Sequence, residues 1–367
     1  VIPGITVWGV NCLNDLLAAL NHPELETEKV YQPRIRAEDL LREGTGQDTG
    51  DFREVAGQEN AKRGAEIAAA GFHNLLMIGP PGVGKSMVAG RIPGILPPLT
   101  LKESLEVTGI FSVAGLLPPG QALITRRPFY APHHTVTQAA LIGGGSGIPR
   151  PGMVSLAHRG VLFLDELPEF RKNVLDGMRQ PMEERKVQIA RSAGMVTYPS
   201  DFILVAAMNP CPCGYYPDRN KCRCTQPQIE KYLGKISGPI LDRIDLCVEL
   251  HPVDILHLQK TKTEKSSEDM KRQIRHARER QAERFAGTDC RFNGDIRSAQ
   301  VEEYCPLGEE GQKVMEQLYR TLQLSARVYH RILKTARTIA DLEDREEITG
   351  EHLLEAACYR PSETYWN

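Results

Sequence analysis

One eight-residue segment restricts the fold of this 367-residue chain more than any other feature: Gly79-Pro80-Pro81-Gly82-Val83-Gly84-Lys85-Ser86. It fits the pattern G-x-x-x-x-G-K-[ST], follows four apolar residues at 75–78 and precedes a stretch of helical character. In such a loop the glycines let backbone N–H groups face phosphate, and the N-terminus of the following helix adds partial positive charge. We expect Lys85 to reach the β- and γ-phosphates of ATP and the Ser86 hydroxyl to ligate Mg²⁺. The alternative is a chance glycine-rich turn, which the coincidence of strand, octet and helix disfavours.

Short apolar runs recur along the chain at residues 75–78, 161–164, 202–207 and 246–250, separated by helical stretches. Runs that are apolar throughout are typical of strands buried on both faces, so they predict an α/β fold with a parallel sheet covered by helices. Residues 309–359 read as helix only, with Ser325 and Thr349 as candidate N-caps. The expected domains are a nucleotide-binding α/β domain over 51–252, a charged helical insert over 253–300 and a helical lid domain over 301–367.

Polar side chains follow the second and third runs, where a parallel sheet gathers its ligand-binding groups. Asp165 and Glu166 end the second run, and Asn209 follows the third. We expect Asp165 to hold Mg²⁺ through water, Glu166 to polarise the attacking water, and Asn209 to orient that water. Arg243 precedes the fourth run and is a candidate arginine finger, a residue that acts on the nucleotide of a neighbouring subunit. The alternative for Arg243 is an ion pair with an aspartate beside it in the sequence.

Four of the nine cysteines lie close together, at Cys211, Cys213, Cys222 and Cys224. The pattern C-x-C-x₈-C-x-C places two close pairs of thiols on either side of a short polar loop, and four thiolates suit tetrahedral Zn²⁺. The spacing therefore predicts a small zinc-binding insertion over 211–224. Reduced cysteines without a metal, or labile disulfides, are the alternatives.

Basic residues in loops and turns are candidates for contact with a DNA backbone. A glycine-rich stretch at 143–147 precedes one of them, and a predicted β-hairpin at 186–198 carries two more. Three others lie in the cysteine loop, beside tyrosines that can stack on bases. These candidates are Arg150, Lys186, Arg191, Arg219, Lys221 and Arg223. The alternatives are an ordinary surface hairpin and, for a further basic stretch at 271–284, a solvated helix face.

Composition adds little about the partner but something about the compartment. The formal net charge of −2 neither favours nor excludes nucleic acid, and no run of 18 apolar residues indicates a membrane span. Clustered cysteines in a chain without secretory features indicate the reducing cytoplasm. The start of the sequence has no initiator Met, which predicts a piece of a longer protein, and residues 23–50 read as a linker.

Several segments taken together carry a family resemblance. They are AAAGFHNLL at 68–76, RPFYAPHHT at 127–135, PRPG at 149–152, SLAH at 155–158, DELPEF at 165–170 and NPCPCG at 209–214. In this order they resemble the AAA+ ATPases related to magnesium chelatase, and most closely the ComM (YifB-like) competence-protein family. The resemblance covers about residues 51–360 and departs from the family pattern at Met153, where an acidic residue is expected.

The resemblance implies roles for individual residues. Asn209 would be sensor 1, Arg243 the arginine finger and Arg327 sensor 2, while Val55 and Gly57 would lie beside the adenine. It also implies a hexameric helicase that drives branch migration in homologous recombination of incoming DNA during natural transformation. Family members carry an N-terminal Lon-protease-like domain, of which residues 1–22 would be the tail.

Two classes of function share such an ATP site. A translocase or helicase acting on branched DNA is favoured by the cysteine loop and the basic stretch. A protein remodeller of the magnesium chelatase or chaperone type is the alternative. A regulatory ATPase for the protease-like domain is a third possibility, although the sequence contains no recognisable Ser/Lys pair of such a domain.

Overall fold

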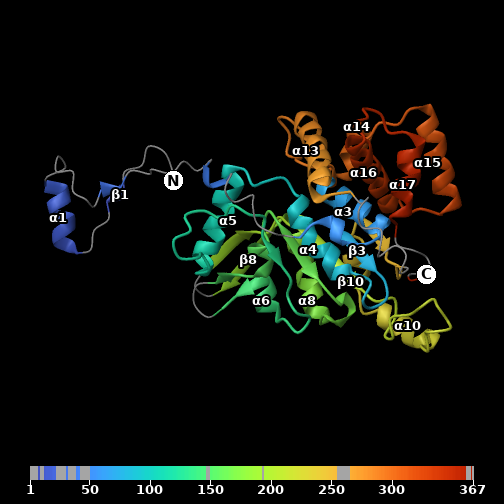
Figure 1. The fold of residues 1–367 in the computed structure, drawn as a ribbon, viewed down its shortest axis with the longest axis horizontal. Coiled ribbons are helices and arrows are strands. Elements are labelled where there is room, and N and C mark those ends of the chain that lie inside the picture. Colours follow the sequence, from blue (N-terminus) through green and yellow to red (C-terminus); the bar gives the residue numbers. More distant parts are fainter. Residues whose placement is uncertain are drawn as a thin grey trace. The chain divides into compact units, whose positions relative to one another are not determined.

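The computed structural model describes residues 7–8, 12–21, 30–31, 39–41, 50–145, 149–191, 194–253, 265–360 and 365. The chain divides into two compact units, Val1–Gln47 with Pro98–Arg126, and Asp48–Pro97 with Arg127–Asn367. All candidate site residues belong to the second, larger unit, whose sheet and surrounding helices are drawn in Figure 1. Most of the expected tail and linker, residues 1–50, lies outside the described residues.

The described residues of the smaller unit include two short strands and the helices α1 and α5. Strands β1 (Val7–Trp8) and β2 (Val30–Tyr31) pair antiparallel, and α1 spans Leu13–Asn21. Helix α5 (Leu101–Ala114) begins with a reciprocal cap, in which Thr100 and Glu103 each accept a hydrogen bond from the other's backbone N–H. It ends at Gly115, whose φ of 72° is the left-handed conformation that glycine adopts easily.

Five parallel strands form the sheet of the larger unit, in the order β11-β3-β10-β7-β4. The bounds of β3 (Leu75–Ile78) and β7 (Val161–Leu164) are those predicted, and β10 (Ile203–Met208) and β11 (Leu246–Glu249) differ from the predicted runs by one residue. The predicted α/β fold with a parallel sheet is confirmed. Strand β4 (Phe129–Tyr130) escaped prediction because it has only two residues, both partly exposed at the sheet edge.

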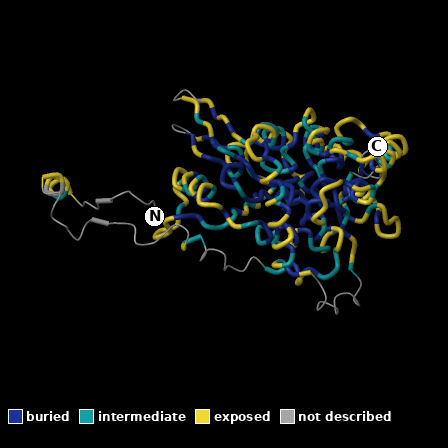
Figure 2. The backbone as a smooth tube through the Cα atoms, turned by 90° about the horizontal axis from the view of Figure 1, so that it is seen from above, coloured by how far each residue is buried: buried dark blue, intermediate teal, exposed yellow. Residues whose placement is uncertain are grey.

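Alternate side chains of the central strands enter two different cores. In β3, Leu75 and Met77 join one core, while Leu76 and Ile78 join the other. The first core takes in residues of α3 (Glu59–Gly71), α4 (Lys85–Ile95), α13 (Ser267–Arg284) and α16 (Ala326–Leu342), and the second those of α7 (Met153–Leu156), α8 (Lys172–Gly177) and α10 (Gln226–Leu233). Helices therefore cover both faces of the sheet, and the buried backbone runs through the middle of this unit in Figure 2.

Smaller elements connect these layers. The predicted hairpin is confirmed as β8 (Lys186–Arg191) and β9 (Gly194–Pro199), and β5 (Gly143–Gly144) pairs antiparallel with β6 (Arg150–Pro151). The remaining elements are α6 (Gln138–Ile142), α9 (Arg179–Glu184), α11 (Gly238–Leu241), α14 (Val301–Tyr304), α15 (Glu309–Thr321), α17 (Gly350–Cys358) and the 3₁₀ turns η2 (Phe52–Glu54), η3 (Leu167–Glu169), η5 (Asn293–Asp295) and η6 (Ser298–Gln300).

Helices α14 to α17 form the predicted C-terminal helical region, with α13 beside them (orange to red in Figure 1). Ser325 and Thr349 cap α16 and α17 as predicted, since each hydroxyl accepts a hydrogen bond from the N–H three residues further on.

The basic stretch at 271–284 falls in α13, and four of its six cations have partners within the protein. Arg272 pairs with Asp269 of the same helix. Arg278 donates to the carbonyl of Ala69 at 2.6 Å, while Arg280 and Arg284 pair with acidic residues of the C-terminal region. The last three cations therefore help to hold α13 in the fold.

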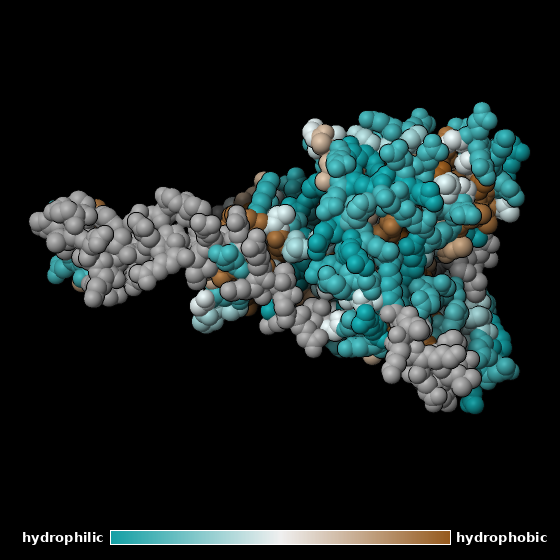
Figure 3. Space-filling view, turned by 45° about the horizontal axis from the view of Figure 1, so that its top comes forward, coloured by the Kyte–Doolittle hydropathy of each residue, from teal (hydrophilic) through white to brown (hydrophobic). Residues whose placement is uncertain are grey.

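None of the helices within the described residues is both long and apolar enough to cross a membrane. The longest of them, α13, has 18 residues and carries charges along its length. The face drawn in Figure 3 is mostly hydrophilic, with apolar residues confined to small areas.

The fully buried Asp341 of α16 generates a stability prediction. It accepts hydrogen bonds from Arg284 at 2.5 Å and from Asn293 at 2.8 Å, and its carboxylate lies 3.2 Å from Arg337. Asp341→Ala leaves these guanidinium groups without a counter-charge, so we expect the free energy of unfolding to fall by about 3–5 kcal/mol in urea denaturation. Glu316→Ala, which breaks an exposed pair with Arg320, is the control and should cost at most about 1 kcal/mol. Equal losses would contradict the structural role of Asp341.

Candidate functional site

The parallel sheet brings three candidate segments to one edge. The phosphate loop (residues 79–86) follows β3, Asp165 and Glu166 follow β7, and Asn209 follows β10. β10 lies between the other two strands, with Met208 paired to Ile78 and Ala206 to Leu164. Because the carboxyl ends of parallel strands meet at the same edge, this pairing places the predicted ATP-binding and catalytic groups side by side.

Lys85 is the centre of the contacts at this edge. Its buried ammonium group donates to the carbonyl oxygens of Gly79 at 2.6 Å and Pro80 at 3.0 Å, and to Oδ1 of Asn209 at 3.0 Å. Burial lowers the pKa of Lys85, and the charges of Asp165 and Glu166 oppose that shift. The predicted loop lysine, the sensor amide and the two acids thus share one electrostatic environment.

The loop fits a bound Mg²⁺ and triphosphate. Gly82 and Gly84 have φ values of 79° and 94°, and a Cβ built on either would meet no atom within 4 Å. Their backbone therefore faces open space, as close approach of phosphate requires. The Ser86 hydroxyl donates to Oδ2 of Asp165 at 3.0 Å, so a hydroxyl and a carboxylate, both oxygen ligands that suit Mg²⁺, already lie together.

The segment proposed to lie beside the adenine joins the phosphate loop through Gln58. Its side-chain amide donates to the carbonyl of Val83 at 3.2 Å and to that of His251 at 2.7 Å. Val55 is buried, and Gly57 has a φ of 60°. Gln58, the residue after Gly57, makes the direct link between this segment and the loop.

His134 is a site residue that sequence reasoning missed. Its Nδ1 lies 3.1 Å from Oε2 of Glu166. The contact arises because β4 pairs with β7, with Phe129 opposite Val161, so the chain leaving β4 passes the end of β7. The available signal was a histidine shortly after a short apolar pair, which is too weak without the strand pairing. His134 therefore lies beside the carboxylate that is the candidate base for the attacking water.

Arg243 lies where the chain enters the sheet, at the amino ends of the strands and opposite the phosphate loop. It precedes β11, which runs parallel to β3, and its carbonyl accepts a hydrogen bond at 2.8 Å from Asn74, the residue before β3. Its guanidinium binds Glu183 and the carbonyl of Pro239. The alternative expected for Arg243 is an ion pair with an aspartate beside it in the sequence. It is wrong, because Arg243 pairs with Glu183 instead.

Arg327 lies at this same amino edge. It forms an ion pair with Asp242, next to Arg243, and burial together with the charge of Arg327 lowers the pKa of Arg243. A cavity of about 250 Å³ opens beside Arg327 and is lined by further cationic side chains from α16. Its lining includes Asp242, Asp245, Arg327, His330, Arg331 and Lys334. The candidate finger and the candidate sensor 2 thus form one basic region away from the phosphate loop.

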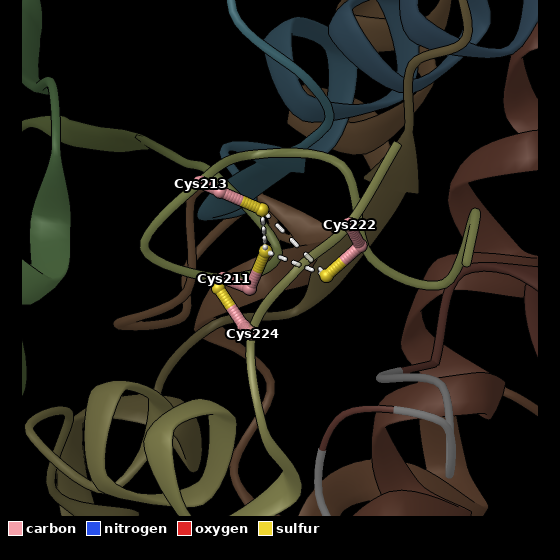
Figure 4. Close-up of side chains that lie close together, drawn as sticks. All are labelled: Cys211, Cys213, Cys222 and Cys224. Atoms are coloured by element: carbon pink, nitrogen blue, oxygen red, sulfur yellow. Dashed lines mark hydrogen bonds between the residues drawn. The ribbon is translucent and has the colours of Figure 1, made fainter. Parts of the chain in front are cut away.

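The four cysteines converge as predicted. Their sulfur atoms all lie within 4.8 Å of one another, and Figure 4 shows them pointing toward a common centre. Cys211 and Cys222 are buried, while Cys213 and Cys224 are half-buried. The sulfur atoms of Cys211 and Cys213 are 3.3 Å apart. Four thiols grouped in this way are compatible with tetrahedral zinc.

Ionisation of the cluster favours one thiolate over the others. Burial opposes ionisation of Cys213, but hydrogen bonds from the backbone of Tyr215 and from neighbouring cysteines outweigh it and hold its pKa at about 6. Burial and the neighbouring thiols raise the pKa of Cys224 to about 12. A bound divalent cation would compensate the charge of the additional thiolates.

The predicted DNA-contacting residues lie on exposed loops and strands, apart from one whose side chain is outside the described set. Arg150 and Lys186 are exposed, and the neighbours of Lys186 in β8, Val187 and Ile189, turn into the core. The cysteine loop exposes Arg219, Lys221 and Arg223. The side chain of Arg191, like residues 146–148 of the glycine-rich stretch, lies outside the described residues.

Comparisons with known proteins agree with this architecture. The family model for magnesium chelatase, subunit ChlI, matches residues 51–258, and that for the ChlI C-terminal region matches residues 264–360. Competence protein ComM of Haemophilus influenzae is 43% identical over 95% of this chain and 66% of that protein. YifB of Salmonella typhimurium is 46% identical over 85% of this chain and 60% of that protein.

A more distant relative is the 67 kDa magnesium-chelatase subunit of Chlorobaculum parvum, 25% identical over 60% of this chain and 34% of that protein. The chain spans 60–66% of the length of the YifB and ComM proteins it matches. Family models cover nearly all of residues 51–360, which include the phosphate loop, both acids and Arg327. The chain belongs to the magnesium-chelatase-related AAA+ family that includes ComM and YifB.

Proposed function

We propose that this chain is an ATP-dependent DNA helicase or translocase that works as a ring, most simply a hexamer, and promotes branch migration in homologous recombination during natural transformation. The AAA+ fold of the family suggests ATPase activity. The observation that carries the ring proposal is the placement of the phosphate loop and Arg243 at opposite edges of one sheet. The relative named as a competence protein supports the recombination setting.

Each residue at the carboxyl edge has a proposed part in hydrolysis. Lys85 would bind the β- and γ-phosphates of ATP, which are joined by the phosphoanhydride that is cleaved. Ser86 and Asp165 would hold Mg²⁺, which would neutralise charge on those phosphates. Glu166 orients a water molecule and accepts its proton, and Asn209 keeps that water between Glu166 and the γ-phosphate. Lys85 donates hydrogen bonds to the loop carbonyls and to Asn209. In the proposed complex with ATP, phosphate oxygens would replace these groups as the acceptors.

Geometry favours action of Arg243 on a neighbouring subunit. Asn74 and Gly79 are separated by five residue steps along β3, or about 16 Å at about 3.3 Å per step. Asn74 contacts the carbonyl of Arg243, so an arginine anchored there does not reach the phosphates of its own subunit. Arg327 shares this edge, and we propose that both guanidinium groups contact the nucleotide of the adjacent subunit. Each ATP site is then complete only between two copies of the chain.

The DNA surface is proposed to consist of exposed basic residues on the hairpin and loops: Arg150, Lys186, Arg191, Arg219, Lys221 and Arg223. Their exposure, where described, lets them meet phosphate without breaking the core. A protein remodeller of the magnesium chelatase type is the second candidate, which the likeness to the Chlorobaculum parvum subunit favours. Both candidates use the same ATP site.

Three further assignments complete the proposal. The cofactors are ATP, Mg²⁺ and a Zn²⁺ held by Cys211, Cys213, Cys222 and Cys224. The domains are those expected from the sequence, with 1–22 as the tail of a protease-like domain, 23–50 as a linker, 51–252 as the ATPase domain with the zinc insertion at 211–224, 253–300 as a helical insert and 301–367 as the lid. The compartment is the reducing cytoplasm.

DNA should stimulate ATP hydrolysis if the helicase proposal holds. We expect single-stranded or forked DNA to raise the rate of phosphate release several-fold, and we expect the affinity for DNA to fall steeply with added salt because basic side chains displace counterions. Lys85→Ala protein, assayed in parallel, shows whether the released phosphate comes from this site. A rate indifferent to DNA, with no salt-dependent binding, would favour the remodeller.

Mixing two inactive variants tests the shared site. Lys85→Ala lacks a working phosphate loop, and Arg243→Ala lacks the finger, so each should lose ATPase activity alone. In rings mixed at equal amounts, about a quarter of interfaces combine an intact loop with an intact finger, so partial activity should return. The control is a mixture of Lys85→Ala with Glu166→Gln, which never pairs an intact loop with an intact Glu166. Absence of recovery in rings shown to exchange subunits would place the finger elsewhere.

A further inference from the structure

The four-cysteine loop packs directly on the nucleotide site. Gly214 closes a tight turn, in which its N–H donates to the carbonyl of Cys211 at 3.0 Å, and its φ is 87°. A Cβ built on Gly214 would lie 2.6 Å from Cδ of Pro81 in the phosphate loop and 3.8 Å from Cγ of Asn209. The backbone of the cysteine loop therefore touches two elements that contact or surround Lys85.

A second path joins the cluster to the sensor residue. Cys211 is fully buried and stands two residues after Asn209, whose side chain accepts a hydrogen bond from Lys85. Tyr232 of α10, the helix that follows the cysteine loop, is buried. Cys211, Cys222 and Tyr232 belong to the same core as Ile78, the residue before the phosphate loop.

The hydrogen bonds that hold the loop are local, and its buried cysteines pack into the core described above. Residues 211–224 contain no helix or strand, and Lys221 and Cys222 donate backbone hydrogen bonds only to the nearby Asp218. A metal bound by four side chains contributes folding free energy in small loops of this kind. The position of the turn at Gly214 then depends on whether the four cysteines bind a metal ion.

We infer that Zn²⁺ at Cys211, Cys213, Cys222 and Cys224 fixes the geometry of the ATP site, so that nucleotide binding and turnover depend on the metal. The cluster acts by positioning: it holds Asn209 and the phosphate loop through Cys211 and Gly214. This role differs from the DNA contact proposed for the basic residues of the same loop. It rests on the proposed ATPase function.

Removal and return of zinc test the inference in the whole chain. Freshly purified, reduced protein should contain about one zinc per chain by mass spectrometry of metals. A zinc-selective chelator used in excess Mg²⁺ should lower the ATP turnover measured without DNA on the order of tenfold or more, because small displacements of catalytic groups cost that much. Added Zn²⁺ should restore it. Absence of zinc in the purified protein, or full turnover after its removal, would overturn the inference.

Two variants distinguish the effect of zinc binding from the effect of the contact between Gly214 and Pro81. Cys222→Ser with Cys224→Ser should lose zinc and turnover together, whereas Cys358→Ser, an exposed cysteine of α17, should keep both. Gly214→Ala retains all four thiols but places a Cβ against Pro81, so it should keep zinc and still lose nucleotide affinity. A zinc-loaded Gly214→Ala protein with normal affinity would contradict the proposed path.

The affinity for a fluorescent ADP analogue distinguishes the two proposals. If zinc-loaded protein binds the analogue but never hydrolyses ATP, the proposed ATPase function fails. A zinc-dependent affinity in that protein would still support the coupling, and a zinc-independent one would reject it.

Discussion

The polarity of the parallel sheet is the constraint on which the rest of the structure depends. Every strand of this sheet runs in the same direction, so loops that leave the strands gather at one edge and loops that enter them gather at the other. The phosphate loop, the two acids and Asn209 leave strands, whereas Arg243 enters one. The groups proposed to bind ATP and the arginine proposed to act on it are thus separated by the length of a strand. In the proposed ring, a second copy of the chain resolves this separation.

The C-terminal helices connect to the amino edge through α16. Arg327 lies at the N-terminal end of that helix, while Thr338 further along it contacts the buried His73 at 2.8 Å. Arg331 donates to the carbonyl of Asp242 at 3.1 Å, beside the candidate finger. Because Asp341 anchors the same helix in a buried network of ion pairs, α16 holds Arg327 on a rigid support. The helical region and the candidate finger are therefore linked through Asp242.

Local patterns in the sequence predicted the parts of the fold that depend on short-range chemistry. The phosphate loop, four strands, the hairpin, the caps at Ser325 and Thr349 and the convergence of the cysteines all follow from residue type and spacing. Contacts that depend on the order of the strands in the sheet could not be predicted from residue type and spacing. The pairing of β4 with β7 brings His134 to Glu166, and the fold of α9 and α11 gives Arg243 its partner Glu183. The contact of Gly214 with Pro81 joins two residues that are 133 positions apart in the sequence, and no periodicity indicates it.

A reconstruction by electron cryomicroscopy of the Glu166→Gln variant with Mg²⁺ and ATP tests whether the ATP site is shared between subunits, since this variant should bind ATP without hydrolysing it. We expect a closed ring in which Lys85 and Asp165 of one subunit and Arg243 of the adjacent subunit surround the same γ-phosphate. Rings in which Arg243 stays paired with Glu183 and points away from every nucleotide, or in which ATP binds away from the phosphate loop, would contradict it.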